Sequence, residues 1–259
     1  MKKAKIQNIL NQTHDIYNTI APDFSITRGK WWHALDEFKN YAKEGDSILD
    51  LGCGNGRLAE LFKNMDVKYL GMDNSEELIK IAQEKFKDKE NIKFEVGDVV
   101  SPPYQGGVRG GLPEGVGNHP QPLLGKEGGF NLIFLLAVLH HIPTEKLRLE
   151  ILKNIYQLLK PGGRLVMSNW NILRVKKYFP RFFDFKYKIT HGVYNLKDAF
   201  IPWKPIGDEN QRYVHSFTKG ELKRLLSKAG FKNLKVYYEN KGVKTNFFKG
   251  YNLMVIVKK

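Results

Sequence analysis

The chain has 259 residues, 42% of them hydrophobic, and carries a formal net charge of +15. A chain of this length can bury one sizeable core, so we expect a single domain over residues 1–259. The longest apolar run, Leu132 to Leu139, is too short to cross a bilayer, and the polar start resembles no signal peptide, so we expect a soluble, cytoplasmic protein with no membrane partner. The only cysteine, Cys53, excludes an internal disulfide and a cysteine-cluster metal site, and we expect no metal.

The excess of positive charge predicts a surface that attracts polyanions such as nucleic acid, through the release of counterions. A generally lysine-rich proteome would give the same totals. Basic residues cluster with aromatic residues between Arg174 and Lys188 instead of spreading evenly, which favours the first interpretation. This dense segment is expected either to bind RNA or to act as a lid over the substrate.

The expected elements begin with a helical cap over residues 1–45. From Ser47 onward, short apolar strands alternate with amphipathic segments of helical length, which predicts an α/β fold with a mostly parallel sheet covered by helices on both faces. We expect strands at Ser47–Leu51, Val67–Met72, Ile92–Val96, Asn131–Ala137 and Arg164–Ser168. We expect helices near Arg57–Asn64, Ser75–Lys87 and Thr144–Leu159, which open beside the N-cap candidates Asn55, Asn74 and Pro143-Thr144.

Three further segments complete this pattern. Residues 101–129 are dense in Gly and Pro, so we expect a disordered insertion on a loop, with a functional lid as the alternative. Residues 171–217 are expected to form a second insertion on the substrate side. Phe231–Glu239 and Tyr251–Lys258 read as two strands joined by a polar, glycine-containing segment, which predicts an antiparallel hairpin at the sheet edge.

The loop Asp50-Leu51-Gly52-Cys53-Gly54-Asn55-Gly56 joins the first strand to the first helix. Glycines in such a loop allow a sharp turn and a close approach of the backbone to a ligand. The spacing differs from the dinucleotide pattern, and it places Asp50 where it could contact the ammonium group of a methionine moiety. A tight turn capped by Asn55 is the purely structural alternative.

Two more acids end the next strands. Asp73 follows the second strand, where a carboxylate can accept both ribose hydroxyls of a nucleoside. Asp98 closes the third strand, where it could accept a hydrogen bond from an adenine amino group, with Val99 beside the ring. A lone acid there is usually a turn former, but three acids at consecutive strand ends favour an adenosyl cofactor.

These residues, together with the turn Leu158-Leu159-Lys160-Pro161-Gly162-Gly163, resemble the motifs of the class I, S-adenosylmethionine-dependent methyltransferases. The resemblance covers roughly Asp46 to Trp170. It implies a Rossmann-like, seven-stranded, mostly parallel sheet with an antiparallel C-terminal hairpin, and S-adenosylmethionine as the cofactor. The residues expected to bind the cofactor are Tyr17, which lies before this region, and Asp50, Gly52, Cys53, Gly54, Asn55, Gly56, Asp73, Asn74, Asp98, Val99 and Ala137.

A narrower resemblance lies outside this core. The segments Tyr17 to Arg28, Trp31-Trp32, Ala137 to His141, Asp198 to Lys204 and Arg212 to Phe217 are similar to the tRNA wobble-uridine carboxymethyl methyltransferases. This resemblance implies methylation of a carboxylate on a modified uridine of tRNA. It also implies a small activating subunit, although residues 101–129 follow the strand edge that such a subunit uses in the eukaryotic enzymes, which leaves the need for it open.

The same resemblance implies roles for residues around the reacting groups. The catalytic candidates are Arg28, His140, Asp198, Arg212 and His215, and the substrate-binding candidates are Trp170, Asn171, Trp203 and Tyr213. Arg28, Arg212 and His215 could contact the carboxylate or phosphates, the tryptophans could stack on bases, and His140 could form a wall of the pocket. The alternatives are purely structural roles: the tryptophans belong to the core, the histidines cap a strand end, and the arginines pair with structural carboxylates.

Three functions are consistent with these patterns. The leading one is a methyltransferase that acts on a carboxylate-bearing wobble uridine in tRNA. The second is a small-molecule methyltransferase on the same scaffold, since a fold alone does not determine its substrate. The third is an RNA-binding protein that keeps the cofactor fold without turnover, and the intact set of Asp50, Asp73 and Asp98 argues against it.

Overall fold

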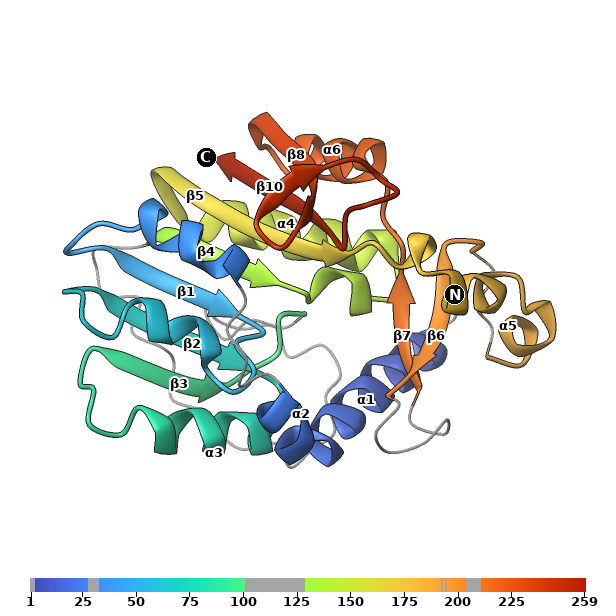
Figure 1. The fold of residues 1–259 in the computed structure, drawn as a ribbon, viewed down its shortest axis with the longest axis horizontal. Helices are drawn as coiled ribbons and strands as arrows, with labels where there is room; N and C mark the ends of the chain where they lie inside the picture. The colour runs from blue at the N-terminus through green and yellow to red at the C-terminus, as the bar shows by residue number, and fades with distance from the viewer. Residues whose placement is uncertain (1–2, 28–32, 101–128, 192, 194, 204–210) are drawn as a thin grey trace.

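An eight-stranded sheet lies at the centre of the structure, a computed structural model that describes residues 3–27, 33–100, 129–191, 193, 195–203 and 211–259 (Figure 1). Its strand order is β3-β2-β1-β4-β5-β10-β8-β9. Strands β1 to β5 are parallel, whereas β10 runs antiparallel to both β5 and β8. The expected α/β architecture and the antiparallel C-terminal strands are therefore confirmed. The expected insertion at 101–129, apart from its last residue, and Arg28, Trp31 and Trp32 lie outside the described residues.

The elements have the following bounds. The strands are β1 Ser47–Leu51, β2 Lys68–Asp73, β3 Ile92–Val96, β4 Phe130–Leu136, β5 Leu159–Trp170, β6 Asp198–Pro202, β7 Gln211–His215, β8 Lys232–Asn240, β9 Val243–Thr245 and β10 Asn252–Lys258. The α-helices are α1 Lys3–Thr19, α2 Ala21–Thr27, α3 Glu76–Lys85, α4 Glu145–Leu158, α5 Phe185–His191 and α6 Lys219–Lys228. The 3₁₀ helices are η1 His33–Tyr41, η2 Arg57–Leu61, η3 Leu139–His141, η4 Ile172–Arg174 and η5 Lys176–Phe182.

The central sheet has one strand more than the seven expected, because β9 folds back on β8. Lys241 and Gly242 form the two-residue turn between them, with φ angles of 52° and 86°. Positive φ at both central positions gives the turn twist that suits a tight antiparallel hairpin. The segment between the two expected strands is therefore not only a connection, as predicted, but contains β9.

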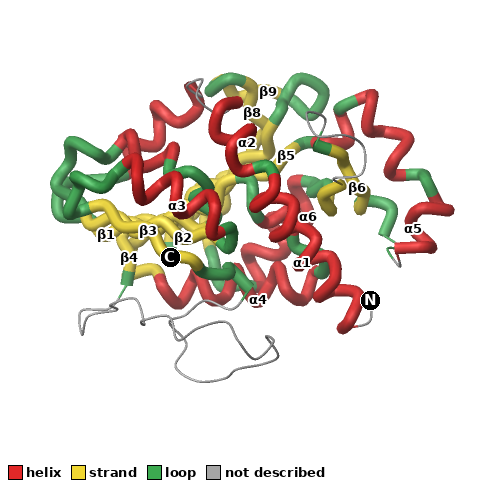
Figure 2. The backbone as a smooth tube through the Cα atoms, turned by 90° about the horizontal axis from the view of Figure 1, so that it is seen from below, coloured by secondary structure: helices red, strands yellow, loops and turns green. Residues whose placement is uncertain are grey.

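A separate two-stranded sheet, β6–β7, lies within residues 171–217 and was not expected as strands. All five residues of β6 are buried, so this strand shows no alternation of apolar and polar residues that would have revealed it. Helix α1 packs against β7 and against α3, so the N-terminal segment joins the small sheet to the large one (Figures 1 and 2).

The core lies on both faces of the central sheet, because neighbouring residues of a strand point to opposite sides. Leu49 and Ile133 pack on one face with side chains of α4 and α6. Ile48 and Phe134 pack on the other face with residues of η1, η2 and α3. Both faces are apolar, as expected for a parallel sheet that is covered on both sides.

The helices begin differently from the expected N-caps in two cases. Ser75, not Asn74, caps α3, and its hydroxyl accepts a hydrogen bond from the Leu78 N–H at 3.2 Å. The segment after the glycine loop forms the short 3₁₀ helix η2 and starts behind Gly56, which has a φ of 72°, so Asn55 is no cap and the expected helix to Asn64 was too long. Thr144 caps α4 as expected.

No helix among the described residues is apolar enough over a sufficient length to cross a membrane. Within the same residues, no group of three or more His, Cys, Asp or Glu side chains is arranged to hold a metal ion.

Candidate cofactor site and substrate pocket

A cavity of about 470 Å³ opens at the carboxyl ends of the parallel strands, where α/β sheets bind their ligands. Loops that follow β1, β2, β3 and β4 line one side of it, and α1 and α2 line the other. Of the residues expected to bind the cofactor, all except Gly56 lie in its wall: Tyr17, Asp50, Gly52, Cys53, Gly54, Asn55, Asp73, Asn74, Asp98, Val99 and Ala137. Their contacts with the cofactor stay a prediction.

The glycine loop turns back beneath β2 directly after β1. The backbone N–H groups of Gly52 and Cys53 both donate to the carbonyl oxygen of Met72. Gly52 has a φ of +74°, and a Cβ at this position would lie 2.2 Å from Cγ2 of Val138. This position therefore requires glycine. Gly56, which stands outside the cavity wall, has a φ of +72° and packs against Phe94 instead.

Asp50 lies at the bottom of the cavity and is 2% exposed. Burial raises the pKa of its carboxyl group to about 7, although the Tyr69 hydroxyl, which donates to Oδ2 at 2.6 Å, acts to lower it. The negative charge of Asp73 raises it further. A carboxylate in this state is stabilised by a cation that binds beside it.

Asp73 and Asp98 face the same cavity from the ends of β2 and β3. Asp73 accepts hydrogen bonds from the N–H groups of Gly54 at 2.8 Å and Ser75 at 3.0 Å, one on each carboxylate oxygen. Each oxygen keeps a second lone pair, so both can accept from a ligand hydroxyl. Asp98 accepts from the Val100 N–H at 2.9 Å. Burial raises the pKa of both carboxyl groups.

These three acids fit S-adenosylmethionine. They line one cavity, with Asp50 buried and Asp73 and Asp98 partly buried, and none of them forms an ion pair within the part of the chain that the structure describes. Burying carboxylates without cations is unfavourable, so the site favours a ligand that carries positive charge and hydrogen-bond donors. The cofactor brings both, as a sulfonium, an ammonium, two ribose hydroxyls and an adenine amino group.

Ala137 follows β4 with a φ of 59°, a conformation that is unfavourable for a residue with a Cβ. Its N–H group is held by Ser168, through the backbone oxygen at 2.9 Å and Oγ at 3.1 Å. Both residues line the cavity. Backbone strain of this kind persists where the surroundings fix it, and here it turns the chain after β4 along the cavity wall.

A hydrogen-bonded chain closes the cavity on the side of α1. His141 donates from Nδ1 to the Tyr213 carbonyl oxygen at 2.8 Å, because that oxygen can only accept. Its Nε2 therefore accepts from the Tyr17 hydroxyl at 3.0 Å. Burial, helped by the charge of Arg212, lowers the pKa of His141 to about 3, so the ring is neutral.

Arg212 lies behind this wall, inside a box of aromatic rings. Its guanidinium carbon is 4.9 Å from the ring centroid of Trp203, 5.2 Å from that of Trp170 and 5.9 Å from that of Tyr17. Nη1 donates to the Tyr17 hydroxyl oxygen at 3.4 Å. The side chain is buried, Nε has no partner, and no carboxylate forms an ion pair with it among the residues described. Among the residues that the structure describes, Arg212 is therefore a buried cation without an anionic partner.

His140 is fully buried between His141 and Trp170, at 4.3 Å and 4.5 Å between ring centroids. Burial, and then the neighbouring His141 and Arg212, hold the pKa of His140 well below its ordinary value. Among the described residues, neither ring nitrogen forms a hydrogen bond of ordinary geometry, and the Asn169 side chain beside the ring only partly offsets the lowering of this pKa. This neutral ring lies beside Trp170, which does line the cavity, whereas His140 itself lies one layer behind it.

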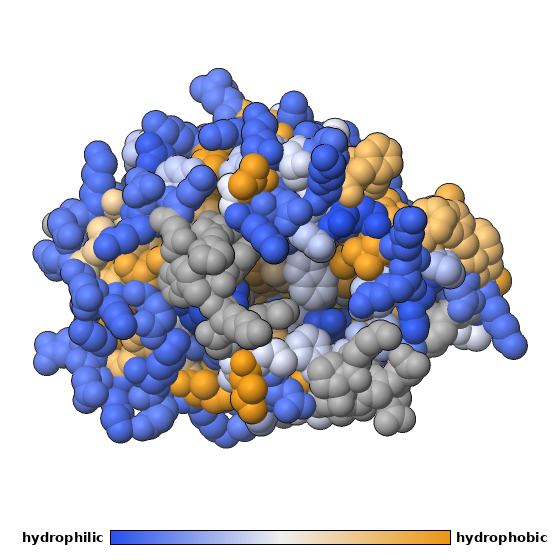
Figure 3. Space-filling model, in the orientation of Figure 1, coloured by the Kyte–Doolittle hydropathy of each residue, from blue (hydrophilic) through white to orange (hydrophobic). Residues whose placement is uncertain are grey.

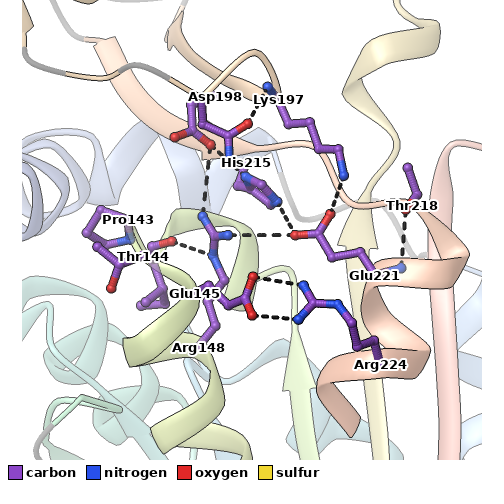
Figure 4. Close-up of polar contacts among 12 residues, drawn as sticks. Pro143, Thr144, Glu145, Arg148, Lys197, Asp198, His215, Thr218, Glu221 and Arg224 are labelled. Atoms are coloured by element: carbon purple, nitrogen blue, oxygen red, sulfur yellow. Dashed lines mark hydrogen bonds and ion pairs between the residues drawn. The ribbon is translucent and has the colours of Figure 1, made fainter. Parts of the chain in front are cut away.

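Asp198 and His215 belong to a buried network away from the cavity (Figure 4). His215 contacts Asp198 through Nδ1 at 2.6 Å and Glu221 through Nε2 at 2.7 Å. Arg148 lies between these two acids, 4.0 Å from each, and donates to the Ile142 carbonyl and to the Tyr213 hydroxyl. Because both ring nitrogens of His215 are occupied, the imidazole has no free edge toward a substrate, and its catalytic role stays a prediction.

Glu221 receives a third partner in this network, since Lys197 Nζ lies 2.8 Å from its Oε2. Burial would raise the pKa of Glu221, but the hydrogen bonds from His215 and Lys197 outweigh it and lower that pKa to about 2. The network thus joins α4, α6, β6 and β7 behind the pocket.

The four residues expected to bind substrate lie in different places. Trp170 lines the cavity, and Trp203 forms one side of the box around Arg212. Tyr213 is buried in β7, where its hydroxyl accepts from Arg148. Asn171 is buried too, and its amide donates to the carbonyl oxygens of Phe247 and Gly250. The substrate contacts of these residues stay predictions, and Arg28 lies outside the described residues.

Several residues of the cavity wall were not expected. Phe24 and Thr27 belong to the N-terminal segment whose resemblance was recognised, so a signal for them existed. Ser168 and Asn252 come from β5 and β10, which are antiparallel neighbours, and no local pattern could have indicated them. The other unexpected residues are Leu10, Thr13, Arg57, Leu58, Leu78, Gly97, Leu136, Val138, His141 and Ile142.

The sheet order, the glycine loop and the three acids define a class I S-adenosylmethionine-dependent methyltransferase. The chain belongs to the methyltransferase domain family, which matches residues 25–236. A solved S-adenosylmethionine-dependent methyltransferase from Methanosarcina mazei is 22% identical, with a TM-score of 0.61 that covers 86% of this chain and 96% of that one. A methyltransferase of Haloferax volcanii, solved in complex with the Trm112 methyltransferase activator, is 15% identical, with a TM-score of 0.56 over 93% of this chain and 96% of that one. Both likenesses concern the fold.

Among curated proteins, the tRNA (carboxymethyluridine(34)-5-O)-methyltransferase of Schizosaccharomyces pombe is 27% identical over 229 residues, which are 84% of this chain and 87% of that protein. The first curated relatives are longer, and the chain matches only 35% and 19% of the length of two of them.

Proposed function

We propose that the protein transfers a methyl group from S-adenosylmethionine to the carboxylate of a carboxymethyl-type wobble uridine in tRNA. The observation that carries this proposal is Arg212, a buried guanidinium near the cavity for which the described residues provide no anion. A carboxylate is the ligand that a buried guanidinium pairs with best, because two parallel hydrogen bonds can form between them.

The chemistry asks little of the protein beyond positioning. When bound, S-adenosylmethionine supplies an electrophilic methyl group, and a carboxylate is already an ionised nucleophile, so no general base is needed. Arg212 would bind the acceptor carboxylate, and Tyr17 and Trp170, which line the cavity, would enclose the reacting groups. His140 and His141 stay neutral, so neither adds a second positive charge that would draw the carboxylate away from Arg212.

A tRNA substrate is supported by the kinship with the fission yeast enzyme and by the net charge of +15. The alternative, a small-molecule carboxylate on the same scaffold, would use Arg212 in the same way. A small activating subunit also belongs to this proposal, since the Haloferax methyltransferase of the same fold was solved with one. We place this subunit at β3, which is the edge strand at one end of the sheet.

The test is transfer of radiolabelled methyl from S-adenosylmethionine to bulk tRNA, with and without an added Trm112-type subunit. Nucleoside analysis and mild base hydrolysis of the product follow. We expect label in a modified uridine that base releases as methanol, because a methyl ester is hydrolysed where an N-methyl or C-methyl group is not. Label that survives base, or label confined to small molecules of a cell extract, would refute the carboxylate of tRNA as the acceptor.

A further inference from the structure

Residues 172–191, which we call the aromatic arm, expose large apolar side chains beside basic ones. The phenylalanines Phe179, Phe183 and Phe185 are 49%, 48% and 57% exposed. Phe179 and Phe183 lie 5.1 Å apart between ring centroids. Soluble proteins expose single apolar residues freely, but a contiguous group of this size within a few residues marks a binding surface. Figure 3 shows apolar side chains among hydrophilic ones at the end of the molecule where α5 lies.

The backbone of the arm is held in place by buried contacts, and the exposed rings project from this fixed backbone. Phe182 is fully buried and packs with Ile172, Ala199, Ile201 and Val214 of the small sheet and its surroundings. The Lys188 ammonium is buried and donates to the carbonyl oxygen of Asn195 at 2.8 Å. A segment that is fixed in this way and exposes its rings to solvent is a preformed binding surface, which loses little conformational entropy when a partner binds.

The charge of the arm complements a polyanion. It contains six basic residues and one acidic residue, Asp184. Lys176, Lys177 and Lys186 are exposed. Within the described part of the chain, Lys176 and Lys186 form no ion pair. Their charges are therefore available to phosphate groups.

The arm also adjoins the pocket. Trp170, which lines the cavity, packs against the same apolar cluster as Phe182. A macromolecule that lies on the arm would thus contact a segment whose anchoring residue shares an apolar cluster with the cavity wall.

We infer that the aromatic arm is a docking surface for unpaired RNA, on which bases stack against Phe179, Phe183 and Phe185 while Lys176 and Lys186 contact phosphates. This inference rests on the proposed function, since it concerns how an RNA substrate is held outside the methyl-transfer site. A lipid surface fits less well, because membrane-surface helices are long and present one apolar face, whereas α5 has seven residues and η5 contains Pro180.

The first test is the double variant F179L/F183L. Leucine keeps apolar area but removes the π-face, so base stacking is lost while contacts with an apolar partner survive. Binding of an unmodified anticodon stem-loop and of single-stranded oligonucleotides is measured by fluorescence anisotropy, without any methyl transfer. We expect at least tenfold weaker RNA binding, and unchanged affinity for S-adenosylmethionine. Val243→Ala, an exposed apolar residue of β9, is the control and should bind RNA like the parent.

The second test is the double variant K176A/K186A, compared with K80A/K87A on α3 and in the turn after it. Both pairs remove the same charge, and Lys80 and Lys87 are also exposed. We expect the first pair to reduce the slope of log affinity against log salt by about 1 to 2, and the second pair to leave the slope unchanged.

Two results would overturn the inference: RNA binding by F179L/F183L that equals the parent, or arm-dependent binding to vesicles of phosphatidylcholine and phosphatidylglycerol with RNA binding unaffected. Loss of RNA binding in the arm variants of a protein that methylates no tRNA would refute the proposed acceptor and support the arm. If instead the enzyme methylates tRNA and both arm variants keep a normal KM for tRNA, the docking role of the arm would be refuted and the proposed acceptor would be supported.

Discussion

At the scale of single residues, Asp50 couples cofactor binding to pH. With a pKa of about 7 in the free protein, its carboxyl group is largely protonated below pH 7 and must lose this proton when a cation binds beside it. The affinity for S-adenosylmethionine should therefore rise with pH up to about 7 and then level off, by at most tenfold per pH unit for this one group. Isothermal titration calorimetry between pH 5.5 and 8.5 measures this dependence.

Two variants separate Asp50 from other acids. Tyr69→Phe removes the hydrogen bond that lowers the pKa of Asp50, so the levelling point should move to higher pH. Asp50→Asn should flatten the profile, with a loss of affinity that is large above pH 7 and smallest at pH 5.5, where the parent carboxyl group is mostly neutral. A parent affinity that does not vary between pH 5.5 and 8.5 would contradict the proposed contact with a cationic ligand.

Asp73 and Arg212 should fail in different ways. Asp73→Ala removes the carboxylate that faces the cavity between Gly54 and Ser75, and we expect at least a tenfold loss of affinity for the cofactor, about 1.4 kcal/mol or more. Arg212→Ala should leave cofactor affinity within about twofold and lower kcat/KM for the acceptor by about a hundredfold, since a charged hydrogen-bonding partner is lost. Equal loss of cofactor binding in both variants would refute this division of roles.

Gly52 offers a sharp test of the loop geometry. Gly52→Ala should destabilise the protein through an unfavourable φ, which costs about 1–2 kcal/mol, and through contact of the new Cβ with Val138, which adds about 1–3 kcal/mol. Gly45→Ala is the matched control, because Gly45 has a φ of +82° but no atom within 4 Å of a new Cβ. Urea unfolding of both variants isolates the contact, and similar free energies of unfolding would show that Val138 can move aside.

The three acids that meet at the cavity could be predicted from the sequence, whereas residues that reach it through distant contacts could not, for a physical reason. Asp50, Asp73 and Asp98 each follow a parallel strand, and parallel strands end at one edge of a sheet, so their sequence positions alone bring them together. His141 and Asn252 reach the pocket through contacts with distant segments, β7 and β5 respectively. No local pattern indicates such contacts.

At the scale of elements, the buried network behind the pocket should matter more for stability than the exposed ion pair beside it. Arg148→Met leaves Asp198 and Glu221 buried without the cation between them, and we expect a loss of about 3–5 kcal/mol in the free energy of unfolding. Arg224→Met on α6 removes a bidentate but exposed pair with Glu145, which is worth about 0.2–1 kcal/mol. Urea denaturation compares the two variants, and equal losses would mean that the network does not tie α4 to α6.

The element boundaries show which signals were strong. Strands β1 to β5 were found because apolar runs alternate with amphipathic helices along the chain. The pair β6–β7 was missed because β6 is buried along its whole length and lacks a period of two. Gly242 indicates a turn at Lys241-Gly242, but the sequence does not show that the residues after this turn form the strand β9, which pairs with β8.

At the scale of the whole molecule, 42 basic residues against 27 acidic ones give a formal net charge of +15 at pH 7, and hence a net positive electrostatic field around the protein. Such a field raises the rate at which a polyanion meets the protein, but it does not select one site. In our proposal, the aromatic arm and Arg212 add that selection at short range, the first for unpaired bases and the second for a carboxylate. On the same proposed substrate, the net charge would thus act at long range, and the aromatic arm and the pocket would act through direct contact.

The salt dependence of binding distinguishes tRNA from a small acceptor for the molecule as a whole. A protein that contacts several phosphates releases counterions, so its affinity for tRNA should fall at least tenfold between 50 and 200 mM salt. Affinity for S-adenosylmethionine, whose charges we propose are held inside the cavity at Asp50 and its neighbours, should change less than twofold over this range, since buried pairs are screened weakly. Filter binding of tRNA and calorimetry of the cofactor on one preparation measure both. Affinity for tRNA that is weak and insensitive to salt, with cofactor binding intact, would shift the assignment to a small carboxylate acceptor held by Arg212.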